Sequence, residues 1–419
     1  MNTSLKKILR LFICSLFIAN CSLLLAWDFG FTFNQKANVL GYGSDTDFRY
    51  SGNMVPSISG LFGENSEYYL SAGLEAAYLE SLGFISELLR TELTFRFRAL
   101  EIKAGRIYYS DPLDLIFSGI FDGAKVSYES RFGNFYAGGW YTGAIYKKRL
   151  NIEMTAADQE LTNAPLNTDE YWNSYYAPKR LVAGLGWEHL SLGGEPSGSA
   201  ALLGQFDLSN GASPGREATG GDSTVNSQYI TAKGILPVNE FSFSLGGGLQ
   251  FVQQSGKFGT GFMAELGIDF VPKISPNNKL SFLARYASGK SGGLDAFLPV
   301  TTVNQGYILG PKLSGITMLQ IDYSAPFHDT LSAGISSSYF IRNDMKTYSG
   351  YPLSVDESGN IENAGSFLGN EFFLRLMWRP FSDISVNLGG GVFFPSLGDV
   401  APKADNIWRV ELSVALLLY

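Results

Sequence analysis

Apolar and polar residues alternate along much of this chain, in runs of about ten positions. The clearest run lies near the C-terminus and places six apolar side chains on one face: Trp408, Val410, Leu412, Val414, Leu416 and Leu418. Similar runs begin at Trp27, Phe262 and Phe372. A period of two indicates β-strands with one apolar face, and about ten residues is the length that a tilted strand needs to cross a bilayer.

The connections between these runs alternate in length. Short turns occur near 63–66, 131–134, 237–239, 275–278, 327–329 and 381–383, and long polar stretches occupy roughly 146–178, 209–225, 289–312, 343–367 and 395–405. Bacterial barrels have this asymmetry, with short periplasmic turns and long external loops. The pattern therefore predicts an all-β fold, a transmembrane antiparallel β-barrel of about 18 strands. If the first strand, at Trp27, runs away from the periplasm, an even number of strands makes the last one run back toward it and end at Tyr419. Both termini then lie on the periplasmic side.

One stretch fits two interpretations. The apolar residues of Leu74 to Leu89 match a helix of period 3.6 nearly as well as two strands. We favour two strands joined through Leu82-Gly83-Phe84. A short helix in this stretch would reduce the strand count to about 16.

The N-terminal residues have the pattern of a secretory signal. Lys6, Lys7 and Arg10 precede an apolar run from Leu11 to Leu25, and Ala26 ends it. This order predicts a removable signal peptide over 1–26 and a single barrel domain over 27–419. A lipoprotein signal that uses Cys21 is the alternative, but Asn20 is a poor residue before a lipidated cysteine.

Composition narrows the class of protein. Aromatic residues make up 14% and charged residues 17% of the 419, and the mean hydropathy is +0.03. Beyond residue 26 no apolar run approaches the roughly 18 residues of a spanning helix. The aromatic content argues against disorder. The net charge of -8 argues against nucleic-acid binding, which needs a basic surface.

Removal of residues 1–26 would change the charge and the cysteine count. The rest of the chain has 28 Lys and Arg against 39 Asp and Glu, a net charge of about -11. Both cysteines, Cys14 and Cys21, lie in the removed segment. The exported protein would then have no disulfide, no cysteine metal site and no cysteine nucleophile.

Three segments carry a family resemblance. Gly105–Pro112 followed by Phe121–Lys125 resembles a strand-loop-strand unit of porins similar to the alginate-export family, and Trp378–Val386 with Phe393–Asp399 resembles their final hairpin. Tyr419 resembles the C-terminal aromatic assembly signal of bacterial barrels. The resemblance implies an 18-stranded barrel that passes an anionic polysaccharide through an arginine-lined lumen.

Charged residues inside strands should face the lumen, because a basic side chain that faces lipid costs roughly 2–4 kcal/mol at the midplane. This rule predicts the following pore-lining residues: Arg96, Arg98, Arg106, Lys125, Glu265, Asp269, Arg285, Asp322, Glu371, Arg375, Arg379, Arg409 and Glu411. Their mixed signs do not favour a purely anion-selective pore. Neutralising ladders between adjacent strands are an equally good interpretation of any single pair. The segment with Glu101, Lys103 and Arg106 needs a rim position or a bulge.

Aromatic residues near the predicted strand ends are typical of an interfacial girdle. The cluster Tyr171, Trp172 and Tyr175 differs, since it falls in the longest predicted external loop. It could constrict the mouth or contact a ligand there, although a packed loop is the simpler interpretation.

We find no pattern of an enzyme in the sequence. The only histidines, His189 and His328, lie near predicted periplasmic turns and have no recognisable catalytic frame. No metal ligand set, cofactor motif or nucleotide motif is visible.

The sequence therefore predicts an outer-membrane channel for passive diffusion of small hydrophilic solutes, such as sugars or organic anions. Its partners would be outer-membrane lipid, the barrel-assembly machinery and those solutes. A closed barrel that acts as an adhesin or ligand-binding protein is one alternative, and an uptake channel for hydrophobic compounds is the other.

Overall fold

The computed structural model describes residues 27–418, apart from 80, 168–170, 190–194, 210–223, 255, 274–276, 291–294 and 345–364. It contains one antiparallel sheet of 18 strands, which confirms the predicted fold and strand count. The strands are β1 (Trp27–Tyr42), β2 (Asp45–Leu61), β3 (Ser66–Leu79), β4 (Ser81–Phe97), β5 (Leu100–Ser110), β6 (Ser118–Ser130), β7 (Gly133–Tyr141), β8 (Arg180–His189), β9 (Ser197–Asp207), β10 (Val225–Val238), β11 (Phe241–Gln254), β12 (Lys257–Phe270), β13 (Lys279–Ala287), β14 (Ile316–His328), β15 (Leu331–Arg342), β16 (Phe367–Phe381), β17 (Ile384–Phe394) and β18 (Ile407–Leu418).

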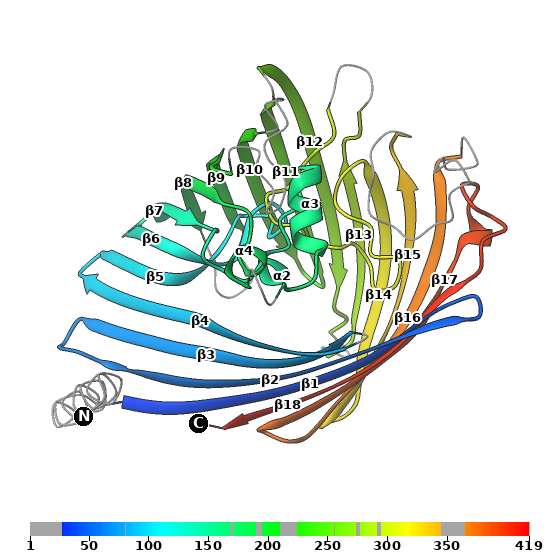
Figure 1. Cartoon of the computed structure of the whole chain (residues 1–419), viewed down its shortest axis with the longest axis horizontal. Helices are drawn as coiled ribbons and strands as arrows, with labels where there is room; N and C mark the ends of the chain where they lie inside the picture. The colour runs from blue at the N-terminus through cyan, green and yellow to red at the C-terminus, as the bar shows by residue number, and fades with distance from the viewer. Residues whose placement is uncertain are drawn as a thin grey trace.

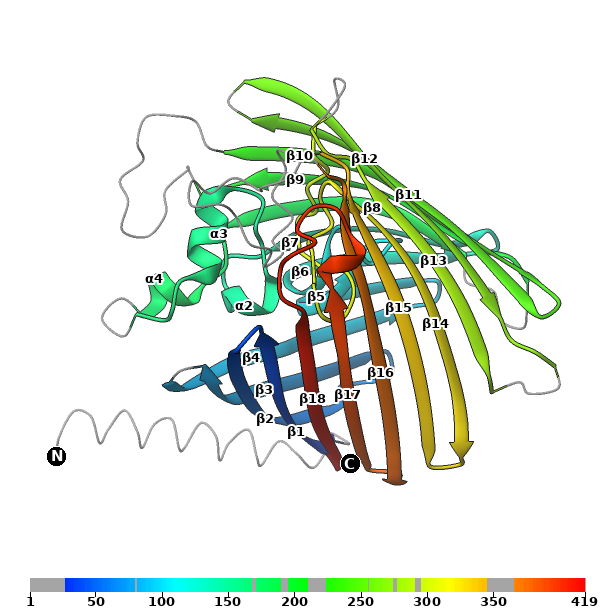
Figure 2. The same cartoon turned by 90° about the vertical axis from the view of Figure 1, so that its right-hand side faces the viewer.

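The sheet closes on itself between the first and last strands. β1 pairs with β18 from Phe31↔Leu418 to Tyr42↔Ile407, while its other edge pairs with β2. Figure 1 shows β18 beside β1, and Figure 2 shows the wall from the side on which these strands meet. Closure pairs the first strand with the last, so neither of them has a free sheet edge, as strands in lipid require to satisfy their backbone groups.

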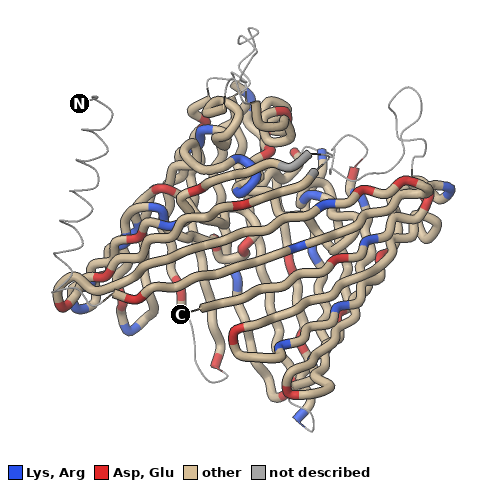
Figure 3. The backbone as a smooth tube through the Cα atoms, turned by 60° about the horizontal axis from the view of Figure 1, so that its bottom comes forward, with Lys and Arg blue, Asp and Glu red and all other residues tan. Residues whose placement is uncertain are grey.

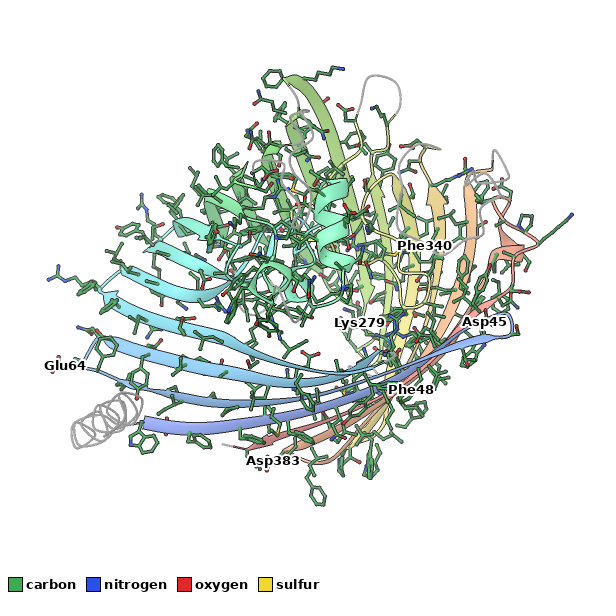
Figure 4. The ribbon with its side chains drawn as sticks, viewed as in Figure 1. Asp45, Phe48, Glu64, Lys279, Phe340 and Asp383 are labelled. Carbon is green, nitrogen blue, oxygen red and sulfur yellow. The ribbon has the colours of Figure 1, made fainter. Side chains whose placement is uncertain are left out.

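The two rims of the barrel differ as expected. One rim holds short turns such as 62–65, 98–99, 131–132, 239–240, 329–330 and 382–383, and the other holds the long connections 142–179, 288–315 and 395–406. Figure 4 labels Glu64 and Asp383 in short turns and Asp45 at the opposite rim. Trp27 and Leu418 both lie at the rim of short turns, so the predicted parity of the strands is confirmed.

The ambiguous stretch Leu74 to Leu89 forms two strands, which confirms the interpretation that we favoured. The connection is earlier than predicted, because β3 ends at Leu79 and β4 begins at Ser81. Gly83 and Phe84 therefore lie inside β4 and pair with β3.

The outer face of the wall is apolar. One register row runs through Tyr323, Ile335, Leu374, Val410 and Phe48, and each of these side chains is at least 42% exposed. Such a band is the surface that lipid tails cover in membrane barrels. In the described part of the chain, no helix is long and apolar enough to span a membrane.

Two predictions lie outside the described residues. These are the signal peptide over 1–26, with the alternative at Cys21, and the terminal aromatic Tyr419. Both remain predictions.

Candidate channel lumen

The register separates the face of the wall that points into the barrel from the face that points outward. Beside the apolar outer row described above, the next row runs through Asp322, Ser336, Phe373, Arg409 and Asp47. Phe373 is only 2% exposed, because loops inside the barrel cover it. Figure 3 shows acidic and basic residues along the strands as well as at the rims.

Most of the predicted pore-lining residues lie on these inward rows. They are Arg96, Lys125, Glu265, Asp269, Arg285, Asp322, Glu371, Arg375, Arg409 and Glu411. Arg96 lies close to the rim of short turns. There it helps to line a cavity of about 540 Å³ together with Arg98, Glu101, Glu129 and His189.

Three predicted residues have other positions. Arg98 lies in the turn between β4 and β5, with a left-handed φ of 53°, so it belongs to the rim and not to a strand. Arg379 is exposed two residues before the end of β16, next to the turn at 382–383. Arg106 shares its register row with Thr91, Asp122 and Tyr141, which continues to the outward-facing Leu181. Its guanidinium therefore lies in the wall and does not point into the lumen.

The inward charges form ion pairs, some within one strand and some between neighbouring or next-neighbouring strands. Glu92 accepts from Arg90 at 2.6 Å and lies 3.3 Å from Lys103, while Glu265 lies 3.0 Å from Lys233 and 2.5 Å from Arg285. Glu411 lies 2.7 Å from Arg409 and 3.2 Å from Lys36, and Arg375 pairs with Asp322. The neutralising ladders that the sequence left open are thus present. They leave a wall that is charged but nearly balanced in sign.

The connection between β13 and β14 crosses the inside of the barrel in its described part, residues 295–315. Glu371 on β16 accepts the backbone N–H groups of Tyr307, Ile308 and Leu309 at 2.7, 2.9 and 3.1 Å. Arg375 donates to the Tyr307 hydroxyl at 2.9 Å, and Arg409 donates to the Tyr307 carbonyl at 2.8 Å. Part of the predicted pore lining therefore holds a loop in place.

The same connection reaches the opposite wall. Gln250 on β11 accepts from the Leu298 N–H at 2.8 Å and donates to the Leu298 carbonyl at 3.1 Å, and the Tyr229 hydroxyl of β10 donates to that carbonyl at 2.6 Å. Between these anchors, the Val300 N–H donates to the Ile116 carbonyl and the Thr302 N–H donates to the Asn151 carbonyl. Three connections, 111–117, 142–179 and 288–315, thus meet inside the barrel.

The short connection 111–117 is held by one carboxylate. Asp111 accepts from the N–H groups of Leu113, Leu115, Ile116 and Phe117 at 2.8–3.2 Å. Burial raises the pKa of Asp111, and these backbone donors oppose that rise. The apolar side chains of this connection pack into a buried cluster with Trp140 and Phe297.

The longest inward connection, 142–179, contains three short helices. They are α2 (Lys147–Leu150), α3 (Ala156–Asn163) and α4 (Tyr171–Tyr175). Thr155 and Asp158 form a capping box at the start of α3. Asp158 also lies 2.5 Å from Arg180, a fully buried residue of β8 that lies 2.8 Å from Asp207. Burial raises the pKa of Asp158, and the charge of Arg180 opposes this effect.

The helix α2 places three consecutive basic residues, Lys147, Lys148 and Arg149, inside the barrel mouth. Burial lowers the pKa of Lys147 to about 8, and the nearby charge of Lys148 adds to the effect. Burial also lowers the pKa of Lys148, which Glu153 raises and Arg49 lowers further. Arg49 lies on an inward row of β2, so its charge acts on Lys148 from inside the barrel.

The predicted aromatic cluster belongs to α4. Tyr171, Trp172 and Tyr175 pack with ring centroids 5.3–6.1 Å apart, and Trp172 remains 63% exposed. The Tyr175 hydroxyl donates to the Ser86 carbonyl of β4 at 3.0 Å. The cluster thus packs against the wall.

Sequence reasoning missed Arg49, Lys148 and Tyr307. The alternating pattern identifies inward positions on strands, but it does not show which external connections fold back into the barrel. One signal was available: Leu115, Ile116, Phe117, Phe297 and Val300 are strongly apolar for residues of exposed loops, and the structure buries all of them.

Over the described residues, no group of three or more His, Cys, Asp or Glu side chains could hold a metal ion. His328 bonds Thr330 in a short turn, and the His189 ring stacks on Trp187.

Comparisons with known proteins identify the fold. No family model matches the chain, and no curated protein matches it. Solved structures match along nearly the whole length. Pseudomonas aeruginosa OpdQ has a TM-score of 0.60 at 11% identity and covers 94% of this chain and 98% of its own. OccK2 (OpdF) of the same organism, solved in complex with glucuronate, has a TM-score of 0.61 at 12% identity and covers 94% of this chain and 96% of its own. The outer membrane protein OpdK of that organism has a TM-score of 0.60 at 11% identity over 93% and 98%. The chain therefore has the fold of these outer-membrane β-barrels.

Proposed function

We propose that this protein is an outer-membrane channel for passive diffusion of small hydrophilic solutes, and not an enzyme. One observation carries the proposal: three connections fold into a closed barrel and meet a wall of paired charges of both signs. A polar lumen that loops have narrowed passes small hydrated solutes and retards larger ones. The apolar outer band supports placement in a membrane.

We propose organic anions or acidic sugars as the preferred solutes. Lys148 of α2 is exposed inside the barrel and within electrostatic range of Arg49, which concentrates positive charge at the part of the lumen that the loops narrow. The solved complex of OccK2 with glucuronate shows a small organic anion on a barrel of this fold. Long polysaccharides fit less well, because the connection 288–315 crosses the lumen; the resemblance to alginate-export porins remains a prediction.

The rival functions make different use of the same barrel. An adhesin with a closed lumen does not need charged side chains along the inner wall of the barrel. A channel for hydrophobic compounds needs an apolar cavity, whereas the inner wall of this barrel carries ion pairs. We propose that residues 1–26 are removed as a signal peptide and that the barrel-assembly machinery inserts the rest.

Single-channel recording in planar bilayers tests the proposal. We expect discrete open steps and a reversal potential that favours anions under a salt gradient. Lys148→Glu should shift the reversal potential toward cations, because it inverts a charge at the narrow part of the lumen. The matched control is Lys273→Glu, since Lys273 is 73% exposed at the rim of short turns. A barrel that inserts into the bilayer but does not conduct would refute the proposed channel. Equal shifts of the reversal potential in Lys148→Glu and Lys273→Glu would refute the placement of Lys148 in the narrowed part of the lumen.

A further inference from the structure

Within the described residues, the shortest register between neighbouring strands of the barrel wall lies at the seam between β4 and β5. The register between these strands covers seven residue pairs, from Phe97↔Leu100 to Thr91↔Arg106. Beyond Thr91, β4 continues for ten residues to Ser81 and remains paired with β3 alone. β5 continues to Ser110 and remains paired with β6. Figures 1 and 2 both show β4 and β5 separating, with α2 between them.

The seam opens at the level of the outer leaflet. A tilted strand needs about 9–11 residues to cross the hydrocarbon core, and the shared register ends seven positions from the rim of short turns. Outward side chains beyond that point are still apolar or aromatic: Phe84 is 74%, Leu88 45% and Tyr108 56% exposed. The separated part of the wall therefore faces lipid.

Side chains and the connection 142–179 close this opening. Arg106 donates to the Leu88 carbonyl across the seam, to Asp122 at 2.8 and 2.9 Å, and to the Ala144 carbonyl at 2.9 Å. Arg149 of α2 donates to Glu87 at 2.6 Å, and Tyr175 of α4 donates to the Ser86 carbonyl at 3.0 Å. An open sheet edge is not tolerated in lipid unless protein covers it, and here the cover is a loop.

A loop held by a few side-chain bonds opens at a lower free-energy cost than a strand ladder. Every other neighbouring pair of strands is held by a longer register of at least eight residue pairs. The seam at β4 and β5 is thus the place where the wall can open sideways without breaking strand pairing.

The two sides of the cover differ in chemistry. The lumen side carries Lys148 of α2, which is exposed and within electrostatic range of Arg49. The aromatic cluster of α4 includes Trp172, which is 63% exposed, and the rings of Tyr175 and Tyr176. Trp and Tyr rings favour the boundary between headgroups and hydrocarbon. A molecule with an anionic head and one alkyl chain matches both sides.

We propose that the seam between β4 and β5 is a lateral gate through which single-chain anionic amphiphiles pass between the lumen and the outer leaflet. The head lies along α2 and the chain lies between Leu88 and the rings of α4. The described parts of this connection, 142–167 and 171–179, form the gate, and the bond from Tyr175 to Ser86 is part of its latch. This route goes beyond the axial passage of hydrophilic solutes.

A reversible lock tests the gate. Because the only cysteines of the chain are Cys14 and Cys21, which lie in the predicted signal, a Ser86→Cys/Tyr175→Cys pair can be joined selectively by a short bis-methanethiosulfonate linker. Decane-1-sulfonate is the probe because it stays charged at every working pH, and methanesulfonate is the headgroup control. We expect decane-1-sulfonate to interrupt the single-channel current of the wild type. The linker should abolish these interruptions, reductant should restore them, and methanesulfonate should act equally on both forms.

A conservative pair of variants tests the latch. Tyr175→Phe removes the hydroxyl that bonds Ser86 and should increase the frequency of interruptions about fivefold, the effect of one lost hydrogen bond. Tyr171→Phe on the same helix is the matched control and should leave the frequency unchanged. Equal frequencies in wild type, locked protein and Tyr175→Phe would overturn the gate.

A fluorescence measurement separates failure of the gate from failure of the channel. In proteoliposomes, a decane sulfonate that is brominated along its chain should quench tryptophan emission. The Trp172 component, taken as the quenching that is lost in Trp172→Phe, should also be lost in the locked protein, whereas outward tryptophans such as Trp378 are quenched in every form. This readout needs no axial conductance, so quenching in a non-conducting barrel would refute the proposed channel and support the gate. A Trp172 component that is insensitive to the lock would overturn the gate.

Discussion

Adjacent residues of a strand in this wall meet different solvents. On β16, Leu374 lies on the apolar outer row and is 50% exposed, whereas Arg375 points inward to Asp322 and Tyr307. The side chains on the two faces are therefore under opposite constraints, although they are neighbours in the sequence. Because every second residue of a strand faces outward and is apolar, the fraction of charged residues in the whole chain is low.

We predict that Leu374→Arg destabilises the folded barrel by about 2–4 kcal/mol, because it turns a basic side chain toward lipid. Arg375→Gln is the control on the next residue and should alter ion selectivity with little effect on folding. Urea titration in phospholipid vesicles, followed by heat-modifiable gel mobility, measures the difference. A harmless Leu374→Arg together with an unfolded Arg375→Gln would mean that the two faces are assigned the wrong way round.

The sequence predicted the strands more completely than the connections. Alternation over residues such as Phe262 to Phe270 depends only on the two environments of a strand, so the strand count and the directions followed from it. The separation of β4 and β5 near Arg106 could not be predicted, because it depends on contacts with the distant connection 142–179 and not on the alternation within either strand. The inward folding of 142–179 and 288–315 depends on tertiary anchors such as Glu371 and Arg180, which are far away in the sequence.

At the scale of elements, the docking of α2 depends on a buried lysine. Lys147 is fully buried and donates to the Ala164 carbonyl at 2.7 Å, and burial lowers its pKa to about 8 from an ordinary 10.5. Between these two values the undocked helix binds more protons than the docked helix. Docking must therefore strengthen as pH rises through this window and weaken as pH falls through 8.

We predict that closures and openings caused by movement of the connection 142–179 become rarer between pH 7 and pH 10. Gating events in single-channel records, counted at fixed voltage, measure this. Lys147→Met should remove the pH dependence, because it cannot titrate. Lys257→Met, at an exposed position at the start of β12, should retain it. A pH dependence that survives Lys147→Met would assign the effect to another group.

At the scale of the whole molecule, the strands close the barrel and the loops set its bore, so the two properties should respond independently to mutation. Glu371 tests this, since its carboxylate holds three consecutive N–H groups of the connection 288–315 but takes no part in strand pairing. We expect Glu371→Ala to release that connection and raise the single-channel conductance, while heat-modifiable mobility of the barrel persists. Asp269→Asn is the control, because Asp269 is inward on β12 but pairs with Lys279 near the rim of short turns, away from the connection. An unchanged conductance in Glu371→Ala, with the barrel intact, would show that 288–315 does not limit the passage of ions. Loss of the barrel in Glu371→Ala would instead show that the inward loops are needed to hold the wall together.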